Sequence, residues 1–141
     1  MTYAIKAEVR DLDATQFEFA DQKTMYGGKR IQAGDTVYIF ASENEGGPGL
    51  IARGVVLSAK PSPKIVHLER QTPRVSLTIK RTGTALRRLG RAELKPFKNW
   101  NDGRPETELN FKYYRQATNK IVGLSDNAAA FLETFFTRKS R

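Results

Sequence analysis

The sequence predicts a mainly β domain of the α+β class, folded as a small closed or half-closed barrel. Three observations support this prediction. Short runs of alternating apolar residues recur along the chain, which is typical of half-buried strands. Glycine and proline clusters separate these runs at close spacing, so that about six or seven short strands are expected with two or three short helices. The length of 141 residues suits one domain, which we place at residues 1–141.

The first half of the chain contains the clearest strands. Residues 3–9 alternate well enough for a first strand, whereas residues 11–24 are polar and indicate a loop with a short helix. Residues 36–41 and 50–59 are rich in β-branched and aromatic side chains. The glycine-rich segment 44–49 between them predicts an antiparallel hairpin.

The second half mixes strands with helices. Residues 65–68 indicate a short strand, and Val75, Leu77 and Ile79 alternate with polar residues as in a half-buried strand. Leucines and arginines over residues 84–94 predict a short basic helix. The remaining expectations are a polar loop over 97–108, strands over 111–116 and 120–124, and a final helix capped by Ser125.

Composition excludes several classes of site. The chain has no Cys and a single histidine, His67, so disulfides, thiolate zinc sites, Cys nucleophiles and histidine-rich metal clusters are all excluded. We expect neither a bound cofactor nor a metal. No apolar run approaches the roughly 18–20 residues of a membrane helix. The start of the chain lacks the pattern of a signal peptide, so we expect a cytoplasmic protein.

Positive charge is concentrated in the middle of the chain. The net charge is +9, but residues 51–100 hold 12 basic and 2 acidic residues, while residues 1–50 hold 5 basic and 8 acidic ones. Such segregation predicts a positive face for a polyanion, most simply nucleic acid. A merely solubilising surface would mix the signs more evenly. Membrane-surface binding is a weaker alternative because the basic residues lie mostly outside amphipathic helices.

Aromatic residues lie near basic ones at three places. Tyr26 precedes a Gly-Gly-Lys-Arg turn, Trp100 lies in a polar loop, and Tyr113-Tyr114 is followed by Arg115 and Gln116. Aromatic faces hold an unstacked base, while guanidinium and amide groups read its edge. The alternative is that one tyrosine of the pair simply points into the core.

The segment Ala33–Ser42 resembles the strand of EVE domains in which Gly-Asp opens an apolar run that ends in Ser. Gly49–Val56 is similar to the next strand of that family, and Tyr114-Arg115-Gln116 followed by residues 120–125 is similar to its Arg-Gln strand and closing helix. EVE domains belong to the PUA-like superfamily, together with YTH and ASCH domains. The resemblance implies a PUA-like small β-barrel of five or six strands flanked by short helices.

The resemblance also implies a noncatalytic module that binds DNA or RNA and holds a modified or flipped base in an aromatic-lined pocket. The base-pocket residues that we expect from it, with Trp100 added as a further wall, are Tyr26, Gly28, Ser42, Trp100, Arg115 and Gln116. Beside the pocket, a phosphate-binding face is expected from Lys80, Arg81, Arg87, Arg88, Arg91, Lys95 and Lys98.

Two other functions remain open at this stage. Glu93-Leu94-Lys95 has the E-x-K form of a nuclease metal site, which predicts a metal-dependent nuclease if the segment is a strand. Alternatively, the barrel serves as a protein-interaction module without base binding. Salt-sensitive binding to an oligonucleotide without turnover distinguishes the first function from both.

Overall fold

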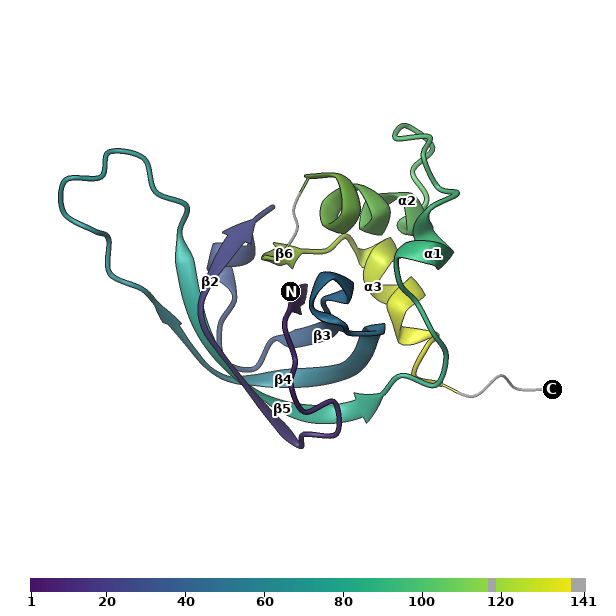
Figure 1. Cartoon of the computed structure of the whole chain (residues 1–141), viewed down its shortest axis with the longest axis horizontal. Helices are drawn as coiled ribbons and strands as arrows, with labels where there is room; N and C mark the ends of the chain where they lie inside the picture. The colour runs from purple at the N-terminus through teal and green to yellow at the C-terminus, as the bar shows by residue number, and fades with distance from the viewer. Residues whose placement is uncertain (117–118, 138–141) are drawn as a thin grey trace.

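The structure, a computed structural model, describes residues 1–116 and 119–137. Six strands close into one barrel in the order β1-β3-β4-β5-β2-β6, and short helices cover one side of it (Figure 1). The strands are β1 (Thr2–Ala7), β2 (Gln16–Met25), β3 (Thr36–Ala41), β4 (Gly49–Pro61), β5 (Arg74–Thr84) and β6 (Ile121–Gly123). The barrel predicted from the sequence is therefore confirmed.

The barrel mixes parallel and antiparallel pairs. β1 runs parallel to β3 and β2 runs parallel to β6, whereas the other four neighbouring pairs are antiparallel. The predicted hairpin is confirmed, since Val37 pairs with Gly54 and Ile39 with Ala52 across β3 and β4. The predicted alternating strand at Val75–Ile79 is likewise part of β5.

Two cores share the barrel wall. Tyr3 and Ile5 of β1 and Val37 and Ile39 of β3 point into the barrel, where they join the apolar side chains of β2, β4 and β5. The alternate residues, such as Phe40, point outward and pack under the helices. Because both faces of β1 and β3 are covered, their sequences are apolar in nearly continuous runs.

The helices are α1 (Arg91–Leu94), α2 (Pro105–Asn110), the π-helical turn η3 (Phe111–Gln116) and α3 (Asp126–Glu133), with two short 3₁₀ turns, η1 (Gly28–Arg30) and η2 (Glu43–Glu45). The predicted cap of the final helix is confirmed, because the Ser125 hydroxyl accepts a hydrogen bond from the Ala128 amide at 3.1 Å. No helix among the described residues is long and apolar enough to cross a membrane.

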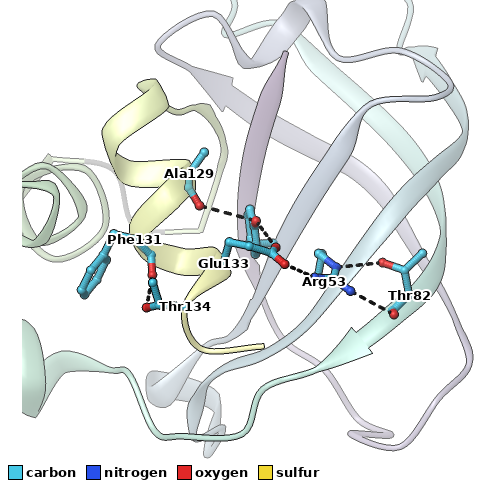
Figure 2. A network of polar contacts seen from close by, with 7 residues as sticks. Arg53, Thr82, Ala129, Phe131, Glu133 and Thr134 are labelled. Atoms are coloured by element: carbon cyan, nitrogen blue, oxygen red, sulfur yellow. Dashed lines mark hydrogen bonds and ion pairs between the residues drawn. The ribbon is translucent and has the colours of Figure 1, made fainter. Parts of the chain in front are cut away.

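A polar network fastens α3 to the barrel wall. The Tyr38 hydroxyl of β3 donates to the Glu133 carboxylate at 2.8 Å, and the Arg53 guanidinium of β4 donates to the same carboxylate and to Thr82 of β5 (Figure 2). Burial, followed by the bond to Glu133, raises the pKa of Tyr38, so that its hydroxyl stays a donor. Three strands are thus tied to one helix residue.

Two sequence predictions, one in the first half and one in the long β4–β5 loop, are wrong. Residues 11–24 do not form a loop with a helix, because Gln16–Met25 is strand β2, with Phe17 and Phe19 pointing into the barrel. A register shift between Phe19 and Gln22 interrupts the alternation, which hid the strand in the sequence. Residues 65–68 form a turn in the β4–β5 loop rather than a strand, and His67 there has a φ of 80°.

Three predictions between residues 84 and 116 are also wrong. The helix expected over 84–94 is helical only at Arg91–Leu94, because the amides of Ala85 and Leu86 donate to the distant carbonyls of Ile51 and Phe135 instead of to carbonyls of the preceding turn. The loop expected over 97–108 contains the start of α2 at Pro105, where proline suits a first helical position. Residues 111–116 form η3 rather than a strand.

Candidate functional site

A cleft of about 560 Å³ opens beside α1 and η3. We name it the basic cleft, and its lining residues are Arg91, Lys95, Lys98, Trp100, Asn110, Tyr114 and Arg115. Four of the seven are cations and two are aromatic, and no carboxylate of the described residues is among them. Its volume lies in the range of roughly 300–1,000 Å³ typical of small-molecule sites.

Two segments that lie apart in the sequence build the cleft. Arg91 begins α1 and Trp100 lies in the loop after it, whereas Asn110 ends α2 and Arg115 belongs to η3. The fully buried side chains of Leu94 and Leu109 hold the two segments together in the outer core. The Asn110 amide donates to the Phe97 carbonyl at 2.9 Å, which fixes one end of the cleft wall.

Trp100 forms one aromatic wall. The Arg115 guanidinium lies over its ring, 4.9 Å from the ring centroid, and Phe111 contacts it edge-on at a centroid distance of 5.4 Å. The Trp100 side chain is only partly covered. A planar ligand bound here would therefore contact an aromatic surface and a neighbouring guanidinium at the same time.

Tyr114 is the second aromatic residue that lines the cleft, and three neighbouring side chains hold it in place. Its hydroxyl donates to Glu43 Oε1 at 2.6 Å, while the Lys6 ammonium and the Arg91 guanidinium lie 4.2 and 5.1 Å from its ring centroid. Burial and the bond to Glu43 raise the pKa of Tyr114, which keeps the hydroxyl protonated. Its ring is thus fixed in orientation.

Lys6 is the buried cation under this part of the cleft. Its side chain is 2% exposed, and its ammonium donates to the Tyr113 carbonyl at 2.8 Å. Burial, reinforced by the positive charge of Arg91, lowers the pKa of Lys6 to about 8. Glu43 offsets part of this effect and also accepts a bond from the Arg91 amide at 2.9 Å.

No protein-family model and no curated protein sequence matches the chain. Solved structures share its fold, among them the following three. The DUF55 domain of human thymocyte nuclear protein 1 aligns with a TM-score of 0.66 at 16% identity, over 95% of this chain and 97% of that one. Human THYN1 protein in complex with DNA containing 5-methylcytosine aligns with a TM-score of 0.65 at 14% identity, over 99% of both chains. A protein from Pseudomonas putida aligns with a TM-score of 0.62 at 13% identity, over 96% of this chain and 99% of that one.

The chain shares the small β-barrel fold of these structures. This agrees with the resemblance seen in its glycine-bounded strands. Identities of 13–16% show the fold alone, so the roles of individual side chains rest on the geometry of this chain.

The barrel brings only some of the expected base-pocket residues together. Trp100 and Arg115 line the basic cleft, and Ser42 is buried at the end of β3, directly before Glu43. The Ser42 hydroxyl has no hydrogen-bond partner among the described residues. Gln116 ends η3, and its side chain lies outside the described part of the chain.

Tyr26 and Gly28 lie at β6, outside the lining of the basic cleft. The Tyr26 carbonyl accepts a bond from the Gly123 amide at 3.1 Å, and the Lys112 ammonium lies 4.9 Å from the Tyr26 ring centroid. Gly28 packs so closely on the Ile121 carbonyl that a Cβ would collide with it. The position of Gly28 is therefore explained by packing.

The expected phosphate-binding residues also fall into two groups, those that line the basic cleft and those that lie elsewhere. Arg91, Lys95 and Lys98 line the basic cleft, while Lys80 is exposed on β5. The other three arginines make contacts within the protein: Arg81 with the carbonyls of Ala14 and Leu12, Arg87 with Thr134 and the Phe135 ring, and Arg88 with the carboxylates of Glu43 and Glu93.

Sequence reasoning missed three residues of the site, Lys6, Glu43 and Asn110. Lys6 lies in an otherwise apolar strand, which is a weak sign of an unusual lysine. Glu43 is one of several acidic residues in a loop-like stretch, and nothing in the sequence links it to Tyr114, 71 positions away. The sequence around Asn110 shows no motif that would mark it as a site residue.

The E-x-K segment has a structural role in this barrel. Glu93 accepts a bond from the Gly90 amide at 2.7 Å and thereby caps α1, and its carboxylate lies 3.6 Å from Arg88. Lys95 instead lines the basic cleft. Across residues 1–116 and 119–137, no group of three or more His, Asp or Glu side chains is placed to hold a metal ion.

Proposed function

We propose that the protein is a noncatalytic nucleic-acid-binding module whose basic cleft takes one unstacked or modified base. The observation that carries this proposal is the lining of the cleft, in which Arg91, Lys95, Lys98 and Arg115 surround the aromatic rings of Trp100 and Tyr114. Cations suit phosphates and aromatic faces suit bases, and a nucleotide presents both at once.

Each part of the cleft has a distinct task in this proposal. Trp100 stacks on the base, a contact worth about 1–3 kcal/mol. The Arg115 fork moves from the Trp100 ring to a phosphate or to the edge of the base, where it offers two parallel donors. Arg91, Lys95 and Lys98 contact the phosphates on either side, which makes affinity depend on salt.

A solved structure of the same fold supports this choice of ligand. Human THYN1 protein was crystallised with DNA containing 5-methylcytosine. We extend the proposal to DNA or RNA with a modified or flipped base, and we retain Tyr26, Gly28, Ser42 and Gln116 as base-pocket residues from the family resemblance. Of these, Ser42 has the strongest support, because its buried hydroxyl is unpartnered among the described residues and adjoins Glu43.

The test is a set of fluorescence-anisotropy titrations with single-stranded DNA and RNA oligonucleotides that carry either cytosine or 5-methylcytosine. We expect salt-sensitive binding by the wild type and a loss of about tenfold or more in Arg115→Ala, as for a charge-assisted hydrogen bond of about 1.5–3 kcal/mol. Arg10→Ala is the matched control, because Arg10 is an exposed arginine that pairs with Glu8 at the surface and is not among the residues that line the basic cleft. Equal affinity of the two variants would reject the basic cleft as the binding site.

A further inference from the structure

The β4–β5 hairpin projects from the barrel as a long arm (Figure 1). Its loop, residues 62–73, carries three aliphatic side chains that are exposed: Ile65 at 63%, Val66 at 75% and Leu68 at 53%. The loop lies on the far side of the barrel from α1 (Figure 1), and α1 contributes Arg91 to the basic cleft. The proposed function makes no use of this arm.

The loop has a defined conformation. The Gln71 side chain accepts a bond from the Ile65 amide at 2.8 Å and donates to the carbonyls of Ile65 and Leu68 at 2.7 and 2.8 Å. The strand ladder reaches the base of the loop, where the Ser62 amide donates to the Arg74 carbonyl at 2.9 Å. The three aliphatic side chains are thus presented by an ordered turn, which reduces the entropy cost when a partner covers them.

Cations lie directly beside this apolar tip. A pocket of about 270 Å³ at the arm is lined by Lys23, Lys64, Arg70 and Arg74 together with Ile65 and Leu68, and no carboxylate of the described residues is in its lining. The nearby Asp21 carboxylate accepts a bond from the Ser62 hydroxyl, and the Arg74 guanidinium donates to the Asp21 carbonyl at 3.0 Å. The arm therefore combines an apolar wedge with a second anion-binding surface.

We propose that this arm is a second nucleic-acid contact, in which Ile65, Val66 and Leu68 insert into a groove of a duplex while the surrounding cations contact its phosphates. Aliphatic wedges flanked by cations are how minor-groove proteins unstack a base step. The proposal rests on the proposed function, since it adds a duplex segment to the nucleic acid held in the basic cleft. A membrane-inserting loop would instead carry Trp, Tyr or Phe at its tip, and residues 62–73 contain none.

The experiment compares two probes by fluorescence anisotropy: a single strand of about six nucleotides, enough for the cleft, and a DNA duplex of about 20 base pairs with a single-stranded overhang. The variants are the triple Ile65→Ser, Val66→Ser, Leu68→Ser and the matched control Leu57→Ser, since Leu57 is an aliphatic residue 46% exposed on β4 outside the loop. All four positions are exposed, so thermal unfolding should change little in either variant.

We expect the triple variant to bind the duplex about tenfold or more weakly than the wild type, as for truncated interface residues, and to bind the short strand like the wild type. A 2-aminopurine in the duplex should brighten with wild type and stay quenched with the triple variant. Lys64→Gln with Arg70→Gln should lower the salt slope for the duplex by about two.

Unchanged duplex affinity in the triple variant would overturn the proposal for the arm while leaving the basic cleft intact, provided that the short strand still binds. Failure of the wild type to bind either probe would instead overturn the proposed function. If the triple variant bound phosphatidylserine vesicles more weakly than the wild type but bound the duplex equally well, the arm would be assigned to a membrane surface. This result would also overturn the proposal.

Discussion

The guanidinium carbon of Arg115 lies 4.9 Å from the centroid of the Trp100 ring, and both residues line the basic cleft. The two residues come from separate segments, one from the loop after α1 and the other from η3. In the free protein the Arg115 guanidinium covers part of the Trp100 ring. A base that stacks on Trp100 must therefore either displace the guanidinium or bind between the guanidinium and the ring. This pair is the part of the site most open to direct test.

Trp100→Ala should weaken binding of an oligonucleotide by about 5- to 150-fold, the equivalent of a stacking contact of about 1–3 kcal/mol. Tyr26→Ala is the comparison, because the family resemblance places Tyr26 in the pocket whereas the geometry places it at β6. Anisotropy titrations of both variants show whether the base stacks on Trp100 or on Tyr26. A larger effect of Tyr26→Ala would locate the base beside β6 and reject Trp100 as its stacking partner.

Replacement of Arg91, Lys95 and Lys98 by Gln should flatten the dependence of log affinity on log salt, by about one unit for each phosphate that the variant no longer neutralises. The slope is measured over a range of salt concentrations with one oligonucleotide. Lys80→Gln with Arg87→Gln and Arg88→Gln serves as the control with the same change in net charge, because Lys80 lies on the outer face of β5 and the two arginines are engaged within the protein. An equal change in slope for both triples would show that phosphates bind across a much broader face.

Gly28→Ala should destabilise the fold by about 3 kcal/mol, the upper end of the cost of overpacking, because its Cβ would meet the Ile121 carbonyl of β6. Gly27→Ala is the control. Gly27 has a φ of +81° but open space around it, so only conformational strain of about 1 kcal/mol is expected. Urea unfolding of the two variants and the wild type gives both changes in the free energy of unfolding. A Gly28→Ala variant as stable as the wild type would remove the packing explanation and favour a direct role in ligand binding.

The stability of the protein should rise with pH between about 8 and 10 because of Lys6. In the folded protein, burial lowers the pKa of Lys6 from 10.5 to about 8, so within this window the unfolded chain binds a proton that the native state has released. The free energy of unfolding then rises by up to about 1.4 kcal/mol per pH unit. Below pH 8 the buried ammonium is charged in both states, and its full cost is present.

Lys6→Met provides the reference for this prediction, since the thioether side chain fills similar space without charge. Chemical unfolding at several pH values gives the free energy of unfolding of each protein. The value for the wild type minus the value for the variant should rise from pH 8 upward. Burial also raises the pKa values of Tyr38, Tyr113 and Tyr114, so these residues oppose the trend only when unfolded tyrosines ionise near pH 10. A flat difference over the window would show that Lys6 keeps its ordinary pKa.

The sequence by itself determined the barrel and its central hairpin. The runs at β3 and β4 are apolar because both of their faces are buried, and the Gly-rich segment between them can only turn, so local pattern and tertiary structure agree there. The Ser125 cap is equally local, since donor and acceptor are three residues apart. The concentration of cations in residues 51–100 predicts a positive surface, which remains a prediction.

Only the tertiary structure decided which of those cations form a site. Arg87 and Arg91 are indistinguishable in sequence, yet one donates to Thr134 near the end of α3 and the other lines the cleft, because residues 85–90 form an irregular, bent segment rather than a helix. The same long-range packing turned residues 111–116 into η3, which places Tyr114 and Arg115 together on the cleft. Contacts such as Glu43 with Tyr114 join distant residues, and local periodicity carries no record of them.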